Sequence, residues 1–185
     1  DVLLIADEVI TGFGRTGRMW GSERYDISPD MITFAKAVTS GYQPLGGVIV
    51  GSAVRDALEA DDTFFLRHGY TYSGHPLACA AGLKNLEIME QHHLLGAAKG
   101  MGYRLERGLR AIAADGGVDH IRGEVAVFAA GLRPDQNAMH IRDAMIRAGV
   151  ITRAINTDTI TFCPPFVTTD DQIDTIIDVF ADAVS

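Results

Sequence analysis

Three short, continuous apolar runs constrain the fold of this chain more than any other feature. They are Val2–Asp7 (VLLIAD), Met31–Lys36 (MITFAK) and Gly46–Gly51 (GGVIVG). A continuous apolar run is typical of a central strand in a parallel sheet, because such a sheet is covered on both faces. We therefore expect an α/β fold in which these runs are buried strands.

Helical segments follow the runs. Ser52 predicts the N-cap of a helix over Ala53–Ala60, and Pro76 predicts the start of a second helix. A third helix is expected over Gly96–Ala114, where apolar residues recur at helical spacing. Its apolar face consists of Leu105, Leu109 and Ile112.

The pattern changes after Gly116, where short strands and short helices are mixed. Strands are expected at VDHIRG, VAVFAAGL, VITRAI and TITFCP, and helices over Gln136–Ala148 and Thr169–Val184. This mixture is typical of a small α+β domain. We therefore divide the chain into residues 1–97, part of a larger α/β domain, and residues 98–185, a small C-terminal α+β domain. The hinge between them is expected near Gly96–Gly102.

Composition and charge exclude several functions. Hydrophobic residues make up 47% of the 185 residues, which favours a folded core over disorder. The formal net charge of −8 argues against nucleic acid as a partner, because phosphate binding needs a basic surface. No apolar run is long enough to span a bilayer and no charged leader opens the chain, so we expect a soluble, cytoplasmic protein without membrane contact.

Cysteine and histidine usage gives no sign of a metal site. Cys79 and Cys163 lie far apart in the sequence, with no His or Cys at ligand spacing. Buried thiols are the expected state, and a disulfide is less favoured in a reducing cytosol. The six histidines form no metal-binding constellation, so no metal is expected.

The segment Gly12–Gly17 matches G-x-G-x-x-G, the outline of a dinucleotide-binding turn. A true site needs a helix directly after the glycines and an acidic strand end about twenty residues further on. Neither follows here, because the next residues carry Gly, Ser and Pro with weak helical periodicity. The segment is therefore interpreted as a tight loop rather than a nucleotide site.

Two charged residues close apolar runs and are better candidates for a site. Asp7 ends the first run and Lys36 ends the second. Ligands of open α/β sheets bind beyond the carboxyl ends of strands, so both side chains would face one crevice. A buried Asp needs a partner, and a lone lysine would more often reach for solvent. A cofactor between the two charges is therefore plausible.

Three segments together resemble one known family. They are DEVITGFGRTG, PDMITFAKAVTSGYQPLGG and HGYTYSGHPLACAAG, and they are similar to the class III aminotransferases, which use pyridoxal 5′-phosphate (PLP). TSGYQPL and GYTYSGHP look most like the ω-amino acid/amine:pyruvate branch. The resemblance implies an aspartate aminotransferase-like fold, represented by the C-terminal half of the PLP-binding large domain and the small C-terminal domain.

The resemblance also implies a role for five residues. Asp7 matches the aspartate that binds the pyridine nitrogen of PLP, and Val9 matches the residue that packs on the ring. Lys36 matches the Schiff-base lysine, which also moves a proton at the substrate carbon. Thr71 matches the threonine that binds the phosphate of the neighbouring subunit's cofactor, although from the residues alone helix capping is the favoured interpretation. Arg153 matches the arginine that binds substrate carboxylates.

The implied reaction is transamination between an amine or ω-amino acid and an α-keto acid such as pyruvate. Because Thr71 would serve a neighbouring subunit, a homodimer or higher oligomer is expected. The chain begins at Asp1 inside an apolar strand, and the first half of such an enzyme is not represented. We therefore expect this chain to need an N-terminal segment for catalysis. The RGEVAVFAAGL segment also departs from the family, because it lacks the usual second glycine.

Two alternatives remain open. The same fold and cofactor serve aminomutases and racemases, which product analysis with pyruvate as acceptor would distinguish. A catalytically incomplete fragment or split subunit, which folds and dimerises without turnover, is the non-enzymatic alternative.

Overall fold

A computed structural model describes residues 2–185, so Asp1, where the sequence analysis begins its first domain, lies outside the described residues. The chain divides into two compact units, Asp1–His93 and Leu94–Ser185. The boundary expected after residue 97 and the hinge expected near Gly96–Gly102 both fall within helix α4 (Leu94–Ala114), which runs without interruption. The two units are described separately below.

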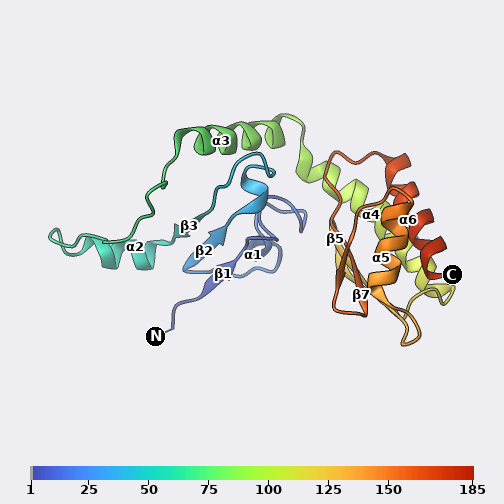
Figure 1. Ribbon diagram of the computed structural model, residues 1–185. Coiled ribbons are helices and arrows are strands. Elements are labelled where there is room, and N and C mark those ends of the chain that lie inside the picture. The colour runs from blue at the N-terminus through green and yellow to red at the C-terminus, as the bar shows by residue number, and fades with distance from the viewer. Residues whose placement is uncertain (1) are drawn as a thin grey trace. The chain divides into compact units, whose positions relative to one another are not determined.

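The first unit contains a three-stranded sheet with the order β1-β2-β3 (Figure 1). The strands β1 (Ile5–Asp7), β2 (Met31–Phe34) and β3 (Gly47–Val50) lie in the three predicted runs. β1 and β2 pair in parallel, but β3 is antiparallel to β2. The expectation of parallel strands is wrong for β3, because the chain turns back after β2 without the long crossover that parallel pairing needs.

The expected burial of these strands is not observed in this chain. Val2, Ile5 and Val48 are 96%, 55% and 55% exposed, and Ile49 and Val50 are also exposed. The helix contact of this unit is between α3 and the short 3-10 helix η1 (Lys36–Val38). Among residues 2–185, no helix of this unit packs extensively on these strands, so their apolar side chains remain accessible.

Three α-helices belong to the first unit: α1 (Gly21–Arg24), α2 (Ser52–Glu59) and α3 (Pro76–Gln91). Pro76 occupies the first turn of α3, as predicted. Ser52 was expected to be the N-cap of α2, but it is the first helical residue and Gly51 is the N-cap. The backbone carbonyl of Gly51 accepts from Arg55 N at 3.0 Å, so the helix begins one residue earlier without a side-chain cap.

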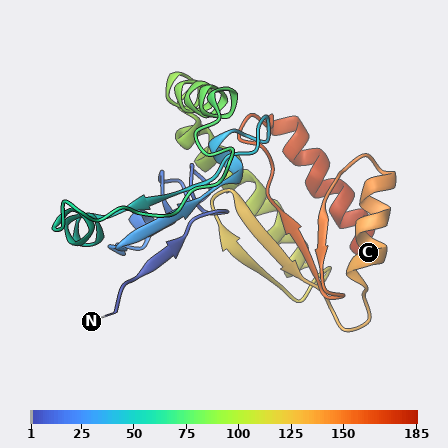
Figure 2. The same cartoon turned by 60° about the vertical axis from the view of Figure 1, so that its left-hand side comes forward.

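The second unit is an antiparallel four-stranded sheet with helices on one side (Figures 1 and 2). The strand order is β4-β5-β7-β6. The strands are β4 (His120–Glu124), β5 (Val127–Gly131), β6 (Arg153–Ile155) and β7 (Thr159–Phe162). The helices are α4, α5 (Ala138–Arg147) and α6 (Asp170–Val184). Every strand and helix predicted after Gly116 is present.

The core of this unit lies between the helices and the sheet. The predicted apolar face of α4 is confirmed, because its three residues, Leu105, Leu109 and Ile112, are all buried. Phe162 of β7 packs edge-on against Phe180 of α6, with ring centroids 4.9 Å apart. This burial of apolar surface is the main source of stability for the unit.

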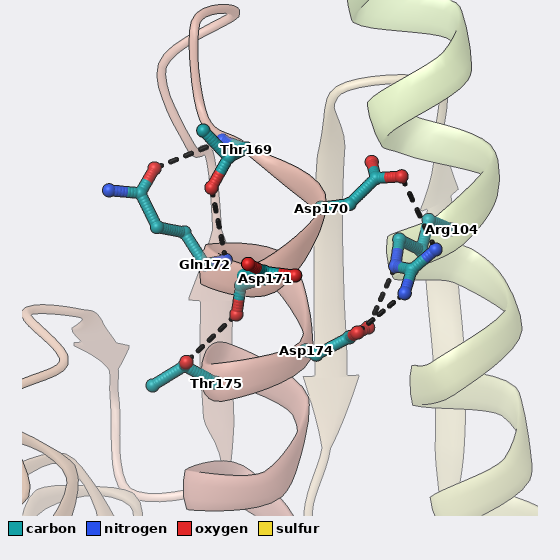
Figure 3. Close-up of polar contacts among 7 residues, drawn as sticks. All are labelled: Arg104, Thr169, Asp170, Asp171, Gln172, Asp174 and Thr175. Atoms are coloured by element: carbon teal, nitrogen blue, oxygen red, sulfur yellow. Dashed lines mark hydrogen bonds and ion pairs between the residues drawn. The ribbon is translucent and has the colours of Figure 1, made fainter.

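Helix α6 is held at its start by a cap and an ion pair (Figure 3). The Thr169 hydroxyl accepts from Gln172 N at 3.3 Å, and the Gln172 side chain accepts from Thr169 N at 3.0 Å. Arg104 of α4 donates to both carboxylate oxygens of Asp174, at 2.7 and 2.5 Å. These hydrogen bonds hold the pKa of Asp174 below its usual range and fix α4 against α6.

Three expected absences can be compared with residues 2–185. Among them, no helix is long and apolar enough to cross a bilayer. No His, Cys, Asp or Glu cluster in the same range could hold a metal ion. Cys79 and Cys163 form no disulfide there, but the expectation that both are buried is wrong, since Cys79 is half-buried and Cys163 is exposed. Cys163 directly follows the last residue of β7, where the strand leaves the core.

Candidate cofactor-binding site

The carboxyl ends of β1 and β2 lie side by side in the first unit. The two strands are parallel, and Asp7, the last residue of β1, is in register with Thr33 of β2. Lys36 follows Thr33 by three residues and opens η1. The parallel register therefore brings Asp7 and Lys36 to the same edge of the sheet, where α/β folds bind their ligands.

Asp7 has one occupied and one available carboxylate oxygen. Its Oδ1 accepts from Thr33 Oγ1 at 3.2 Å and from Val9 N at 3.1 Å. Within residues 2–185, Oδ2 accepts no hydrogen bond. Asp7 was expected to be buried with a partner, but it is exposed in this chain. The partner Thr33 was missed by sequence reasoning, because only the strand register identifies it.

The buried carboxylate at this edge is Glu8, the next residue. Glu8 is 2% exposed and accepts from Gly21 N at 2.8 Å, from Ser22 N at 2.6 Å and from the Thr11 hydroxyl. Burial alone would raise its pKa, but the hydrogen bonds from Thr11, Ser22 and Gly21 outweigh burial and lower the pKa below the ordinary value of 4.5. Glu8 had no assigned role from the sequence. The sequence signal that could have identified Glu8 was its position one residue after the strand end, on the face opposite Asp7.

The glycine-rich segment after Glu8 is a series of tight turns, as predicted. Phe13, Gly14 and Gly17 have φ angles of 64°, 112° and 77°. The next helix, α1, spans only four residues, and Glu8 already occupies the N–H groups of its first two residues. An anionic pyrophosphate would have to displace a buried carboxylate there, so the arrangement does not suit a dinucleotide.

Aromatic packing fixes this loop onto the sheet. The Phe13 ring lies 5.0 Å from Trp20 and 5.9 Å from Phe34 of β2, centroid to centroid. Gly47 of β3 lets the Phe34 ring lie close, since a Cβ at residue 47 would be 2.7 Å from that ring. The turn that carries Val9 is therefore anchored at both ends, by Glu8 and by the aromatic cluster.

Lys36 has an unusual backbone for a lysine. Its φ of 43° lies in the left-handed region, which non-glycine residues seldom adopt and which is enriched at functional sites. Asn85 of α3 supports the same segment by donating to the carbonyl of Ala37 at 2.8 Å and of Val38 at 3.3 Å. The Lys36 side chain itself is exposed, so α3 and η1 hold the backbone and leave the amine accessible.

Val9 and Thr71 lie in different environments of the first unit. Val9 is half-buried in the turn after β1. Thr71 is exposed in the turn before α3, and its hydroxyl bonds to no described residue. The alternative role in helix capping is not observed, because the N-cap of α3 is His75, without a side-chain bond. Ser73 Oγ instead accepts from Tyr70 N at 3.0 Å.

Arg153 belongs to the second unit, where it is the first residue of β6 and is exposed. From its residue type alone, an exposed arginine in a strand would more often form a surface ion pair. No carboxylate of residues 2–185 pairs with its guanidinium. The side chain is thus available to a ligand.

The family of this chain is decided by a comparison of its sequence with known families. The model of the family described as Aminotransferase class-III matches residues 1–184. The chain belongs to the class III aminotransferases. The resemblance inferred from the three sequence segments is confirmed.

Individual class III aminotransferases are similar over the whole chain but are much longer. A diaminobutyrate–2-oxoglutarate transaminase of Halomonas elongata is 43% identical, over 96% of this chain and 41% of its own length. The mitochondrial gamma aminobutyrate transaminase 1 of Solanum lycopersicum is 34% identical, over 100% of this chain and 38% of its own length. The chain thus spans about two fifths of these relatives.

Solved structures confirm the expected fold class. A transaminase from the marine bacterium Virgibacillus has a TM-score of 0.92 at 38% identity, covering 98% of this chain and 44% of that chain. An amine transaminase from an uncultivated Pseudomonas species, in a PLP-bound form, has the same score, identity and coverage. The α/β arrangement described above is therefore that of the PLP-dependent transaminases.

Class III aminotransferases are PLP enzymes, and the donor groups at the edge of β1 and β2 suit that cofactor. Asp7 offers an unused anionic oxygen for a protonated pyridine nitrogen. Lys36 offers an accessible amine at the neighbouring strand end. The half-buried Val9 lies two residues after Asp7 and offers an apolar surface. These residues fit PLP in the chemistry of their groups.

Proposed function

We propose that this chain is the C-terminal part of a PLP-dependent class III aminotransferase. Completed by an N-terminal segment, it would move an amino group between an amine or ω-amino acid and an α-keto acid such as pyruvate. The observation that carries the proposal is the parallel register of β1 and β2, which brings Asp7 and Lys36 to one edge of the sheet. A cytoplasmic location stays a prediction from the sequence.

In this proposal, three residues of the first unit each have a separate role. Bound PLP supplies an electron sink for the carbon that carries the amino group. Asp7 would keep a proton on the pyridine nitrogen through Oδ2, while Thr33 and Val9 N orient its carboxylate through Oδ1. Lys36 Nζ would take up and return the proton at the substrate carbon. Val9 would pack against the ring of the cofactor.

Two further residues complete the proposed site. The exposed Thr71 hydroxyl would bind the phosphate of the cofactor held by a neighbouring subunit, so the active form would be a homodimer or higher oligomer. Arg153 would bind the substrate carboxylate, since its planar guanidinium can hold both oxygens. The family resemblance and the availability of both side chains support these assignments.

The test is PLP binding by the polypeptide that contains this chain together with its N-terminal segment. The parent protein should show the visible absorbance of lysine-bound PLP, and Lys36→Ala should abolish it. Lys99→Ala removes an exposed lysine from α4 and serves as the matched control. If the absorbance survived in Lys36→Ala, the assignment of Lys36 would be wrong.

Product analysis separates the proposal from its nearest alternatives. With pyruvate as acceptor, transamination forms alanine, whereas an aminomutase or racemase leaves pyruvate unchanged. The non-catalytic fragment or split subunit is the other alternative, and the sequence leaves it open. Mass spectrometry of the natural protein would identify it by the absence of a longer chain or of a companion polypeptide.

A further inference from the structure

One row of side chains crosses the entire sheet of the second unit. Arg122 of β4 is in register with Ala129 of β5, which is in register with Thr161 of β7, which is in register with Arg153 of β6. Register partners in antiparallel strands point to the same face. The four side chains therefore form one row, with an arginine at each end and two small residues between them.

The row lies on the face of the sheet opposite the helices. The residues that alternate with it, including Phe128, Ile160 and Phe162, are buried in the core against the helices. Figure 2 shows these helices on one side of the sheet. Arg122 and Arg153 are exposed, and Ala129 and Thr161 are half-buried. The row is thus accessible to solvent, with two small side chains between two long cationic side chains.

The two arginines also differ from their paired neighbours in the same unit. Arg104, Arg133 and Arg142 each bind an aspartate, at distances between 2.5 and 3.2 Å. Neither Arg122 nor Arg153 has an ion pair or side-chain hydrogen bond within residues 2–185.

Few other charges occupy this face. His120 bonds to Asp119 at 2.8 Å, and Glu124 lies two residues beyond Arg122 on β4. In a chain with a net charge of −8, the row is therefore a locally cationic strip.

The spacing of the row favours an anion with two separate charges. Three strand spacings of about 4.8 Å place the outer Cα atoms about 14 Å apart. Each guanidinium is a planar fork that binds a carboxylate through two hydrogen bonds. A short carbon chain with a carboxylate at each end can meet both forks, whereas a single phosphate would need the two arginines to converge.

We propose that Arg122 and Arg153 together bind a small dicarboxylate, with one carboxylate on each arginine and the carbon chain over Ala129 and Thr161. The new element is Arg122, which has no role in the proposed PLP chemistry. That the dicarboxylate is an amino-group donor or acceptor rests on the proposed function. The binding itself requires neither PLP nor Lys36, so the two proposals can fail separately.

Titration of the 185-residue chain with glutarate, followed by calorimetry, tests the proposal. Arg122→Gln and Arg153→Gln should each weaken glutarate binding about tenfold, which corresponds to the loss of one charge-assisted contact. Acetate needs only one arginine, so either substitution should change acetate binding by about twofold or less. Arg122→Lys keeps the charge without the fork, and its glutarate affinity should lie between those of the parent and Arg122→Gln.

Two controls give the experiment its specificity. Arg147→Gln removes the same charge from α5, which belongs to the helical side of the unit, and should leave the glutarate affinity unchanged. The titration is made without PLP, which separates this site from the proposed PLP chemistry. The proposal is overturned if the parent chain does not bind glutarate, if phosphate binds more tightly, or if Arg122→Gln binds glutarate as the parent does.

Discussion

Val125 connects β4 to β5 with a φ of 50°, a left-handed conformation that a β-branched residue rarely adopts. This is the turn that lacks the second glycine of the family. The turn packs tightly on α4, because a Cβ at Gly102 of α4 would be 1.7 Å from the Val125 carbonyl oxygen. The fold therefore imposes on valine a backbone that suits glycine.

Because of this strain, we expect a glycine variant at residue 125 to be more stable than an alanine variant, the reverse of the usual order. Val125→Gly and Val125→Ala both remove the valine methyl groups, but only Ala keeps a Cβ in the left-handed region. We expect Val125→Gly to be more stable than Val125→Ala by about 1 kcal/mol. Urea unfolding of both variants measures the difference. A more stable Ala variant would show that the left-handed turn is not adopted in solution.

Glu8 predicts a pH dependence of stability. Its pKa in the folded chain is lowered below 4.5, so its contribution to stability is fully present above that value. The contribution is lost as the pH falls through the folded pKa, because the protonated carboxyl binds the N–H groups of Gly21 and Ser22 less well. We expect Glu8→Gln to be less stable than the parent at pH 7, with a smaller loss of stability on acidification.

The measurement for Glu8 is denaturant unfolding between pH 7 and pH 3. Glu87→Gln is a suitable control, since Glu87 also has a lowered pKa but is exposed and pairs only with Lys84 and Gln91 of its own helix. A parent and a Glu8 variant that lost the same stability on acidification would contradict the role given to the buried carboxylate.

At the scale of elements, the contact between α4 and α6 depends on one small residue. A Cβ at Gly108 of α4 would lie 2.3 Å from Ile177 Cδ1 and 2.7 Å from its Cγ1, so the two helices approach through this glycine. Gly100, in the same helix, has nothing within 4 Å of the same position. The two glycines therefore differ in function although the sequence presents them alike.

The difference gives a matched pair of substitutions. Gly100→Ala should stabilise the chain by about 0.5–1 kcal/mol, because alanine is the better helix former. Gly108→Ala should destabilise it by about 1–3 kcal/mol through overpacking against Ile177. Thermal unfolding compares the two, and the double substitution Gly108→Ala with Ile177→Ala should recover part of the loss. Equal effects of the two alanines would refute the close approach.

The elements themselves were largely predictable from the sequence, with two informative failures. Hydrophobic periodicity and the Pro76 signal located helices α2 to α6 to within a few residues, whereas the short helices α1 and η1 were not predicted. The direction of β3 and the N-cap of α2 were not predictable. Strand direction depends on where the chain turns after β2, and the cap depends on which residue leaves the helical conformation first. Local residue preferences specify neither of these.

At the scale of the whole molecule, the second unit is the more complete of the two. Its sheet has one face filled by three helices, and its core contains the largest buried side chains of residues 2–185, including Phe128 and Phe180. The first unit instead exposes apolar residues on β1 and β3. The relatives are more than twice as long as this chain.

The sequence by itself determined the family, the number and type of most elements, and the candidate residues at the ends of β1 and β2. These follow from local patterns, since apolar runs, turn residues and charged strand ends lie close together in the chain. Only the tertiary structure identified Glu8 rather than Asp7 as the buried carboxylate, paired Thr33 with Asp7, and aligned Arg122 with Arg153. Those relations join residues far apart in sequence, and strand register and packing, which no local pattern encodes, create them.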